Sequence, residues 1–306
     1  MPSQHDPCPQ HEIAREHCPD TSGNRPFGYG TWMTQSERAA AFRLLHERPS
    51  AFVIPNPWDA GTARILAAIG FEALATTSSG LAFTLGRRDA EGAVTRQQAL
   101  NGASAIAAAT PLPVSADLEN GFGDDPETVA ETIRLAAATG VVGGSIEDAT
   151  STGDDPIYPH GQAVERVAAA VEAARSLPFP FVLTARAENY LHGRRDLDDT
   201  IRRLLAYEAA GADVLYAPGL RAIEDVQAIC AALSKPVNVL AGPGFTVDQL
   251  AAAGVRRISL GGALSRAALS AFLRAAREVR QEGSFHFLED AVPVGDLSTF
   301  MAGREQ

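Results

Sequence analysis

The sequence predicts an α/β protein built as one (β/α)8 TIM barrel, in which each of eight parallel strands is followed by a helix. From residue 37 onward, short β-rich runs alternate with alanine-rich helical stretches about every 30 residues. Each run is mostly apolar and ends in small or polar residues, which is typical of parallel strands buried on both faces. A doubly wound open sheet is the alternative, but it usually has a glycine-rich turn after its first strand, where this chain has residues 56–59 (NPWD).

The elements follow one another in an unbroken series. The apolar runs predict strands at 51–57, 73–78, 113–119, 143–149, 181–188, 214–218, 236–242 and 257–261. The alanine-rich stretches predict helices at 59–69, 95–109, 126–139, 162–176, 197–210, 223–233, 247–253 and 265–281, with one more at 37–48 before the first strand. Capping residues support these bounds: Asp124, Asp196 and Thr246 stand at helix starts, and Gly140, Gly211 and Gly254 stand at helix ends.

The chain of 306 residues divides into three parts. Residues 1–34 are polar, rich in proline, histidine and glycine, and lack an apolar period, so we expect a flexible leader. Residues 35–283 are expected to form the barrel that carries the catalytic site. Residues 284–306 are expected to form a tail, and its aromatic side chains suggest that it packs on a neighbouring subunit.

Composition excludes several function classes. The formal net charge is −11, whereas a nucleic-acid-binding domain normally presents a basic surface, so no nucleic-acid partner is expected. Lys235 is the only lysine, which leaves Schiff-base chemistry a single candidate residue. Three cysteines are too few for a disulfide scaffold, and no apolar run reaches the roughly 18 residues of a membrane span. We therefore expect a cytoplasmic protein without a membrane partner.

Acidic residues gather at the ends of the third and fourth predicted strands, where barrels hold their active sites. Asp117 and Glu119 are two positions apart on one strand, so both side chains should point to the same face. Glu147 joins them from the next strand. Because several buried carboxylates need compensation, and oxygen ligands suit Mg²⁺ or Mn²⁺, the cluster predicts a metal site. The alternative is that the carboxylates pair with an internal arginine, Arg186.

Two further features concern anion binding. Arg186 ends the fifth predicted strand, and an arginine beside a metal is suited to bidentate contact with a substrate carboxylate. The turn at 78–81 after the second strand offers hydroxyls and backbone N–H groups for an oxyanion. Glycines at 242–244 and 261–262, after the seventh and eighth strands, leave open a phosphate-binding barrel isomerase.

The chain resembles the isocitrate lyase/phosphoenolpyruvate mutase superfamily. The resemblance rests on six segments in the family's order: 55–61 (PNPWDAG), 79–81 (SGL), 85–89 (LGRRD), 117–123 (DLENGFG), 146–148 (IED) and 184–188 (TARAE). Together these motifs are specific, whereas any one of them alone is a weak signal. The resemblance implies a barrel of the isocitrate lyase/phosphoenolpyruvate mutase type with a C-terminal helix swapped between subunits, and a homo-oligomer, either a dimer or a tetramer.

The resemblance also implies residue roles. Asp117 is similar to the direct Mg²⁺ ligand of the family, Glu119 and Glu147 to carboxylates that hold the metal's waters, and Asp89 to a further acid around them. Arg186 is similar to the residue that binds the substrate carboxylate. The remaining substrate-binding candidates are Trp58, Ser79, Gly80, Leu81 and Asn238, and the remaining catalytic candidates are Glu188 and His160.

One departure from the family bears on the reaction. Family lyases carry a loop cysteine after the I-E-D motif as the acid–base group, but residues 149–162 contain neither cysteine nor lysine. Tyr158 and His160 are the proton-transfer candidates there, although His160 is equally expected simply to begin the next helix.

The expected activity is Mg²⁺-dependent C–C bond cleavage in a small anionic 2-oxo or 2-hydroxy acid, through an intermediate like the pyruvate enolate. A 2-methylisocitrate lyase or an oxaloacetate decarboxylase would fit this description. The alternatives are C–P chemistry, as in a phosphonopyruvate hydrolase or phosphoenolpyruvate mutase, and a barrel that binds oxyacids without catalysis. The sequence alone does not choose the substrate, the acid–base group of the loop or the oligomer number.

Overall fold

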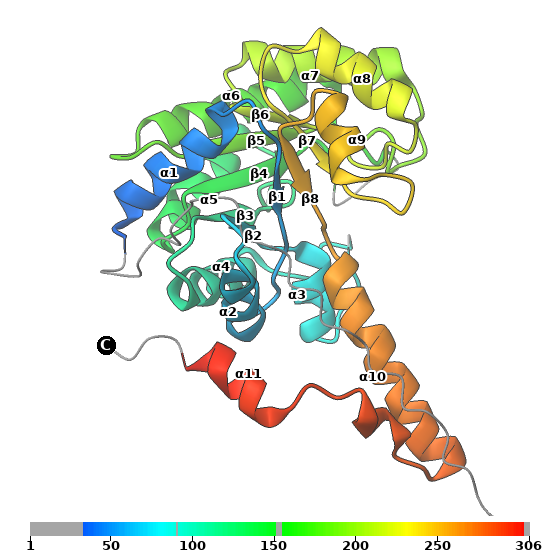
Figure 1. Ribbon diagram of the computed structural model, residues 1–306. Helices are drawn as coiled ribbons and strands as arrows, with labels where there is room; N and C mark the ends of the chain where they lie inside the picture. The colour runs from blue at the N-terminus through cyan, green and yellow to red at the C-terminus, as the bar shows by residue number, and fades with distance from the viewer. Residues whose placement is uncertain (1–32, 90, 151–154, 303–306) are drawn as a thin grey trace, which may run out of the picture. The chain divides into compact units, whose positions relative to one another are not determined.

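The computed structural model describes residues 33–89, 91–150 and 155–302, so all but the end of the predicted leader at 1–34 lies outside the described residues. The described strands form one parallel sheet in the order β1-β8-β7-β6-β5-β4-β3-β2 (Figure 1). They are β1 (Phe52–Ile54), β2 (Leu74–Ala75), β3 (Val114–Asp117), β4 (Gly143–Glu147), β5 (Val182–Arg186), β6 (Val214–Tyr216), β7 (Val237–Leu240) and β8 (Arg257–Ser259). Each lies within the run that predicted it.

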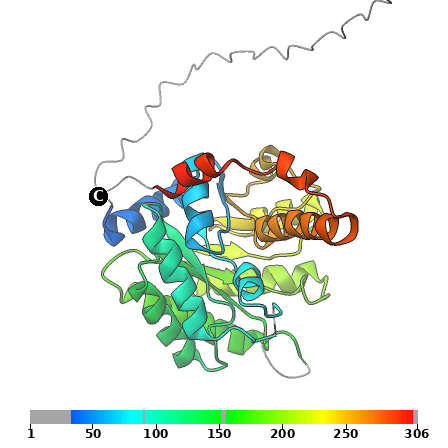
Figure 2. The same cartoon turned by 90° about the horizontal axis from the view of Figure 1, so that it is seen from below.

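Helices alternate with these strands and surround the sheet (Figure 2). They are α1 (Gln35–Glu47), α2 (Ala60–Ile69), α3 (Ser78–Thr84), α4 (Arg96–Ala109), α5 (Pro126–Ala138), α6 (His160–Arg175), α7 (Leu197–Ala209), α8 (Ile223–Ala232), α9 (Val247–Ala252), α10 (Ala263–Glu282), η1 (His286–Glu289) and α11 (Val294–Met301). The predicted (β/α)8 barrel is confirmed.

The barrel is nearly closed between β1 and β2. These two strands share no ladder among the described residues, but the backbone N–H of Ala75 donates to the carbonyl of Pro55 at 3.1 Å. Asn56 bridges the same gap, because its side-chain amide donates to the carbonyl of Thr76 at 2.9 Å and its oxygen accepts from the backbone of Leu260 at 2.9 Å. The residues just after β1 therefore join the two edges at the end of the barrel where the strands finish.

The core between strands and helices is apolar, whereas part of the barrel interior is polar. Buried apolar side chains such as Leu74, Ile133 and Leu183 fill the layer between sheet and helices. Inside the barrel, Arg257 of β8 donates to the hydroxyl of Thr184 on β5 at 3.0 Å. Since β5 and β8 are separated by two strands in the sheet, this hydrogen bond can only cross the barrel lumen.

Two sequence-based expectations about local structure were wrong. The capping residue of α5 is Asp125 rather than Asp124, because the side chain of Asp125 accepts from the N–H of Thr128 at 2.8 Å. The expected turn at 78–81 is the first turn of α3, whose N-cap is Thr77. The glycine assignments hold, since Gly140, Gly211 and Gly254 all have positive φ after their helices.

The C-terminal elements extend from the barrel rather than close it. Helix α10 follows β8 and runs away from the sheet, and Ser265 is its one buried residue (Figure 1). Helix α11 returns to α2, where the guanidinium of Arg64 donates to the carbonyl of Met301. None of the helices in the described ranges has the length and apolar character needed to cross a membrane.

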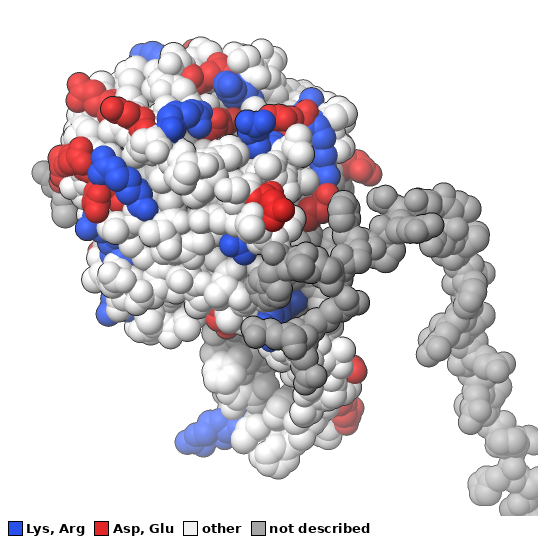
Figure 3. Space-filling model, turned by 90° about the vertical axis from the view of Figure 1, so that its left-hand side faces the viewer, with Lys and Arg blue, Asp and Glu red and all other residues white. Residues whose placement is uncertain are grey.

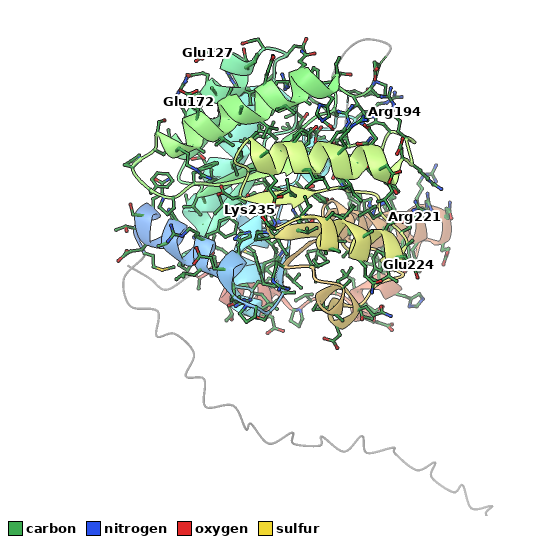
Figure 4. The ribbon with its side chains drawn as sticks, turned by 90° about the horizontal axis from the view of Figure 1, so that it is seen from above. Glu127, Glu172, Arg194, Arg221, Glu224 and Lys235 are labelled. Atoms are coloured by element: carbon green, nitrogen blue, oxygen red, sulfur yellow. The ribbon has the colours of Figure 1, made fainter. Side chains whose placement is uncertain are left out.

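Surface charges are mixed in sign. On the face drawn in Figure 3, lysine and arginine side chains lie among aspartate and glutamate side chains rather than in one basic patch. The side chains labelled in Figure 4 include Glu127, Arg194 and Arg221, which lie at the edge of the molecule in that view. The face drawn in Figure 3 therefore presents no single basic patch for an anionic ligand.

Candidate active site

The candidate site is a cavity of about 170 Å³ at the end of the barrel where the strands finish. Every strand contributes a lining residue at or beyond its C-terminal part. Following the strands from β1 to β8, these residues are Asn56, Thr76, Asp117, Ser145, Arg186, Tyr216, Leu240 and Ser259. This is the end at which (β/α)8 barrels carry their active sites, because the loops that follow the strands converge there.

Asp117 occupies the centre of the acidic cluster. It is the last residue of β3, and its backbone N–H donates to the hydroxyl of Thr76 at 2.8 Å. Its carboxylate accepts from the backbone N–H of Ser78 at 3.1 Å and from a guanidinium nitrogen of Arg186 at 3.1 Å. Ser145 approaches the same carboxylate at 3.4 Å. Donors from three neighbouring segments thus fix the carboxylate at the rim of β3.

Glu119 reaches the cluster by a different route from the one expected. Strand β3 ends at Asp117, and Glu119 has a φ of +48°, so strand alternation does not place the two side chains. Instead the N–H of Glu119 donates to the Asp117 carboxylate at 3.3 Å, and its carbonyl accepts from the N–H of Glu147 at 2.9 Å. Burial, together with the charges of Asp117 and Asp89, raises the pKa of Glu119 to about 7.

Arg186 organises the other carboxylates. Its guanidinium contacts Asp117 at 3.1 Å, Glu147 at 3.0 Å and Glu188 at 2.8 Å, each through a different nitrogen. It also lies over the ring of Tyr216, 5.3 Å from the centroid. Burial raises the pKa of Glu147 and of Glu188, although Arg186 opposes the shift. One guanidinium faces three carboxylates, so the pairing with arginine does occur and still leaves an excess of negative charge.

The donor set fits a hard dication that is bound mostly through water. In the described ranges, no three acidic, histidine or cysteine side chains are placed to hold a metal ion together. The cluster nevertheless consists of carboxylate oxygens with uncompensated charge, which is the chemistry that Mg²⁺ selects. A site with one direct carboxylate and several waters needs no convergence of three ligands. Asp117 could be that ligand, with Glu119 and Glu147 reaching the waters.

The residues predicted for substrate binding lie on two sides of the cavity. Ser79 lines the main cavity, while Trp58 and Leu81 line a hollow of about 10 Å³ that shares Asp117 with it. Gly80 is buried between them, and a Cβ there would lie 2.6 Å from Thr77 and 2.8 Å from Trp58. These four residues belong to the loop after β1 and to α3, which the sequence brings together by close packing at Gly80.

The loop after β4 supplies no obvious proton donor in its described part. His160 begins α6 and does not line the described cavity. Tyr158 is buried, its hydroxyl donates to Asp124 at 2.6 Å, and Arg166 stacks on its ring at 4.1 Å. Burial raises the pKa of Tyr158 to about 12. Tyr158 thus has structural partners, whereas the Nε2 of His160 is buried without a hydrogen-bond partner in the described structure. Residues 151–154 of the loop lie outside the described residues.

Two buried acids behind the cavity have distinct functions in the fold. Asp148 accepts from Arg203 at 3.0 Å, from Tyr207 at 2.6 Å and from the backbone of Glu188 at 2.8 Å. Glu188 in turn accepts from Arg186. Asp148 thus anchors the segment that carries Glu188, and through it the guanidinium of Arg186.

Arg257 is a lining residue that the strand-end analysis missed. It opens β8, far from the end of the strand where functional residues were sought, but its long side chain reaches the cavity. The signal was a charged residue that begins an otherwise apolar interior strand. Asn238, predicted to bind substrate, is buried on β7, where its oxygen accepts from Arg257 at 3.0 Å and its amide donates to Ser259 at 3.0 Å.

A larger cleft of about 580 Å³ lies at the opposite end of the barrel, between α1 and the starts of β5 and β7. Its lining includes Arg43, Arg175 and Lys235, with Glu47 and Asp213 beside them. It contains none of the clustered acids around Arg186. This cleft is the larger of the two, but the smaller cavity is lined by Asp117 and Arg186 of the acidic cluster, so the smaller cavity is the candidate active site.

Among curated proteins, an uncharacterized protein from Mycobacterium tuberculosis is 32% identical over 270 residues, which cover 87% of this chain and 97% of the relative. Other relatives include a 2,3-dimethylmalate lyase from Eubacterium barkeri and an oxaloacetate decarboxylase from Chromohalobacter salexigens, which are 29% and 28% identical. The similarity therefore extends to enzymes, and these two relatives with a named activity are each less than 30% identical to the chain.

Solved structures resemble the chain over most of its length. A Burkholderia cenocepacia protein provisionally described as a lyase/mutase is 60% identical, with a TM-score of 0.86, and covers 89% of this chain and 98% of its own. Oxaloacetate acetylhydrolase in complex with the product oxalate is 27% identical, with a TM-score of 0.80, and covers 89% of this chain and 96% of its own. Residues 42–280 match the family model of phosphoenolpyruvate phosphomutase. The chain therefore belongs to the phosphoenolpyruvate phosphomutase family, within the isocitrate lyase/phosphoenolpyruvate mutase superfamily.

Proposed function

We propose that the chain is a Mg²⁺-dependent enzyme that cleaves a C–C bond in a small 2-oxo or 2-hydroxy acid. The observation that carries the proposal is the excess of carboxylates around Asp117 and Arg186 at the catalytic end of the barrel. Relatives that act on oxaloacetate and dimethylmalate support the choice of C–C chemistry. C–P bond chemistry is the second candidate, because the family model is that of a phosphomutase.

In this proposal each residue of the acidic cluster has its own role in binding the metal ion or the substrate. Asp117 binds the dication directly, Glu119, Glu147 and Asp89 hold its waters, and Mn²⁺ could replace Mg²⁺ in this oxygen-rich set. When bound, the dication stabilises negative charge on a carbonyl oxygen of the substrate. Arg186 keeps the carboxylates in place and contacts the substrate carboxylate.

Substrate binding in this proposal uses both sides of the cavity. Trp58 and the start of α3, Ser79 to Leu81, contact the oxyacid end of the substrate. Because the cavity that Ser79 lines has a volume of only about 170 Å³, a compact acid fits it better than a sugar phosphate.

The test is a panel of oxaloacetate, 2-methylisocitrate, isocitrate and phosphonopyruvate with Mg²⁺, in which pyruvate, glyoxylate and phosphate release is followed. Asp117→Asn should lower kcat about 10³-fold, which corresponds to several kcal/mol of barrier. Asp248→Asn, which changes an exposed acid on α9, is the matched control and should leave kcat unchanged. Phosphate release from phosphonopyruvate, or its conversion to phosphoenolpyruvate, without turnover of the other acids would move the assignment to C–P chemistry. Full turnover in Asp117→Asn would remove the metal role.

We further propose that the protein is a homo-oligomer whose contact surface includes α10. Leu269, Phe272, Leu273 and Val279 lie on one side of this helix and are between 39% and 68% exposed. An apolar helix face of this kind normally packs against another surface. A second copy of the chain is the partner that the family resemblance suggests, either as a dimer or as a tetramer.

A further inference from the structure

Arg257 is a cation of the cavity that has no acidic partner in the described part of the chain. The residue is 4% exposed, and it lines the cavity together with Asp117 and Arg186. Its Nε donates to Asn238 at 3.0 Å and its Nη1 donates to Thr184 at 3.0 Å. Its Nη2 has no acceptor among the described residues. No carboxylate is among the groups that influence its pKa, which burial lowers to about 10.

A buried charge without a counter-ion is costly, and it is normally retained where a ligand or a paired group compensates it. The neutral oxygens of Asn238 and Thr184 orient the guanidinium, but they do not neutralise it. Arg186 is in the opposite situation, because each of its three nitrogens already contacts a carboxylate. Of these two cations, Arg257 is the one whose charge no carboxylate of the described residues neutralises.

The cavity joins this cation to the acidic cluster. Its lining runs from Asp117 at the rim to Arg257, which comes from the start of β8 and reaches inward. Its volume of about 170 Å³ is many times the roughly 10–15 Å³ that a single water molecule needs by the same measure. A compact acid could therefore place one end beside Asp117 and the other end beside the guanidinium.

We propose that Arg257 binds a second oxyanion of the substrate, so that the site selects a dianionic 2-oxo acid over a monoanionic one of the same length. This inference rests on the proposed function, which places the oxyacid end of the substrate at the acidic cluster. Asn238 and Thr184 are positioning residues, since they hold the guanidinium in the orientation in which Nη2 faces the ligand. A carboxylate or a phosphonate supplies the same chemistry, because both accept bidentate hydrogen bonds from arginine.

The test compares ligands that share a carbon chain. Dissociation constants are measured with Mg²⁺ for 3,3-difluorooxaloacetate, which has a distal carboxylate, and for 2-oxobutyrate, which lacks it. Phosphonopyruvate is the phosphonate arm, and oxalate reports on the acidic cluster alone. The proteins are the wild-type chain, Arg257→Gln, Arg257→Lys and the control Arg256→Gln. Arg256 directly precedes β8, does not line the cavity, and its guanidinium donates to the carbonyl of Gly254 at 3.5 Å.

Because Arg257→Gln removes an interaction with a buried charge, it should raise the dissociation constant of 3,3-difluorooxaloacetate at least about 30-fold. Binding of 2-oxobutyrate and oxalate should change by less than about threefold by comparison, since neither reaches the guanidinium. Arg256→Gln should behave as wild type, and Arg257→Lys should recover part of the selectivity. A larger loss for phosphonopyruvate than for the dicarboxylate would identify a phosphonate as the preferred group.

Two outcomes separate the failure of this inference from that of the proposed function. The role of Arg257 is wrong, and the metal site stands, if wild type binds oxalate with Mg²⁺ but shows no preference for the dianion. The same holds if Arg257→Gln raises the dissociation constants of all ligands equally. If wild type binds none of the acids, both are wrong. Wild-type selectivity is measured independently of the variants, so a variant that does not fold leaves the inference open to refutation.

Discussion

Among single residues, His46 shows how burial lowers the pKa of a histidine side chain. It lies on α1 between the rings of Phe42 and Phe52, and its Nδ1 is 2.8 Å from the carbonyl of Phe42. Its Nε2 is buried without a hydrogen-bond partner in the described structure. Burial, with the positive charge of Arg257, lowers the pKa of His46 to about 3, although the Phe42 carbonyl opposes the shift. The folded protein therefore keeps this imidazole neutral where the unfolded chain does not.

The consequence is a stability that falls in acid. Since His46 titrates near its ordinary pKa of 6.5 in the unfolded chain, its contribution is complete above pH 6.5 and is lost as the pH falls toward 3. The loss amounts to about 4 kcal/mol. His46→Gln should flatten the free energy of unfolding between pH 6.5 and 4, measured in guanidinium chloride. His286→Gln, at an exposed position, is the control, and an unchanged pH slope in His46→Gln would contradict the assignment.

Residue positions in the site were predictable where strand geometry sets them. Strands β3, β4 and β5 end at Asp117, Glu147 and Arg186, each two residues before the end of its predicted strand. The three side chains still meet, because parallel strands of a barrel bring their C-terminal ends together. Glu119 was predicted to lie beside Asp117, and it does. The predicted reason, strand alternation, is wrong, because Glu119 follows the end of β3 and has a left-handed backbone conformation. Arg257 could not be found by reading strand ends, because it reaches the cavity only through the length of its side chain.

Among the elements of the barrel, α3 is the helix that sequence reasoning did not predict. Its seven residues include two serines and a glycine, and so short a helix is marginal without tertiary contacts. The contacts come from close packing at Gly80, where a Cβ would lie 2.8 Å from Trp58. The propensities of these residues favour a turn, and it is the tertiary packing that makes them helical.

Replacing the glycine at that contact tests its importance. Gly80→Ala should lower the stability by about 1 to 3 kcal/mol, because the added methyl group must displace Trp58 or Thr77. It should also raise KM, since Ser79 and Leu81 move with the helix. Gly161→Ala on α6, where a Cβ meets nothing within 4 Å, is the matched control and should be neutral or slightly stabilising. Equal melting temperatures for wild type and Gly80→Ala would show that the packing has room to adjust.

At the scale of the whole molecule, the barrel was predictable because its signal repeats. Eight apolar runs with intervening helices leave few alternatives, and the observed sheet joins its strands in chain order except at the gap between β1 and β2. The part that a single chain does not explain is α10, whose apolar side chains remain exposed. In a monomer Phe272 is 68% and Leu273 48% exposed, so their apolar surface contributes no burial free energy, whereas a partner surface would bury it.

The oligomer proposal therefore makes a direct prediction about Phe272. A buried aromatic anchor typically contributes 2 kcal/mol or more to an interface, so Phe272→Arg should weaken association at least about 30-fold. Arg274→Glu, two positions along the helix and therefore on its other side, also changes charge and should leave association intact. Light scattering after size exclusion over a concentration series gives the mass of each protein. A wild-type protein that is monomeric at micromolar concentration, or a Phe272→Arg variant with unchanged mass, would show that something other than a second copy covers α10.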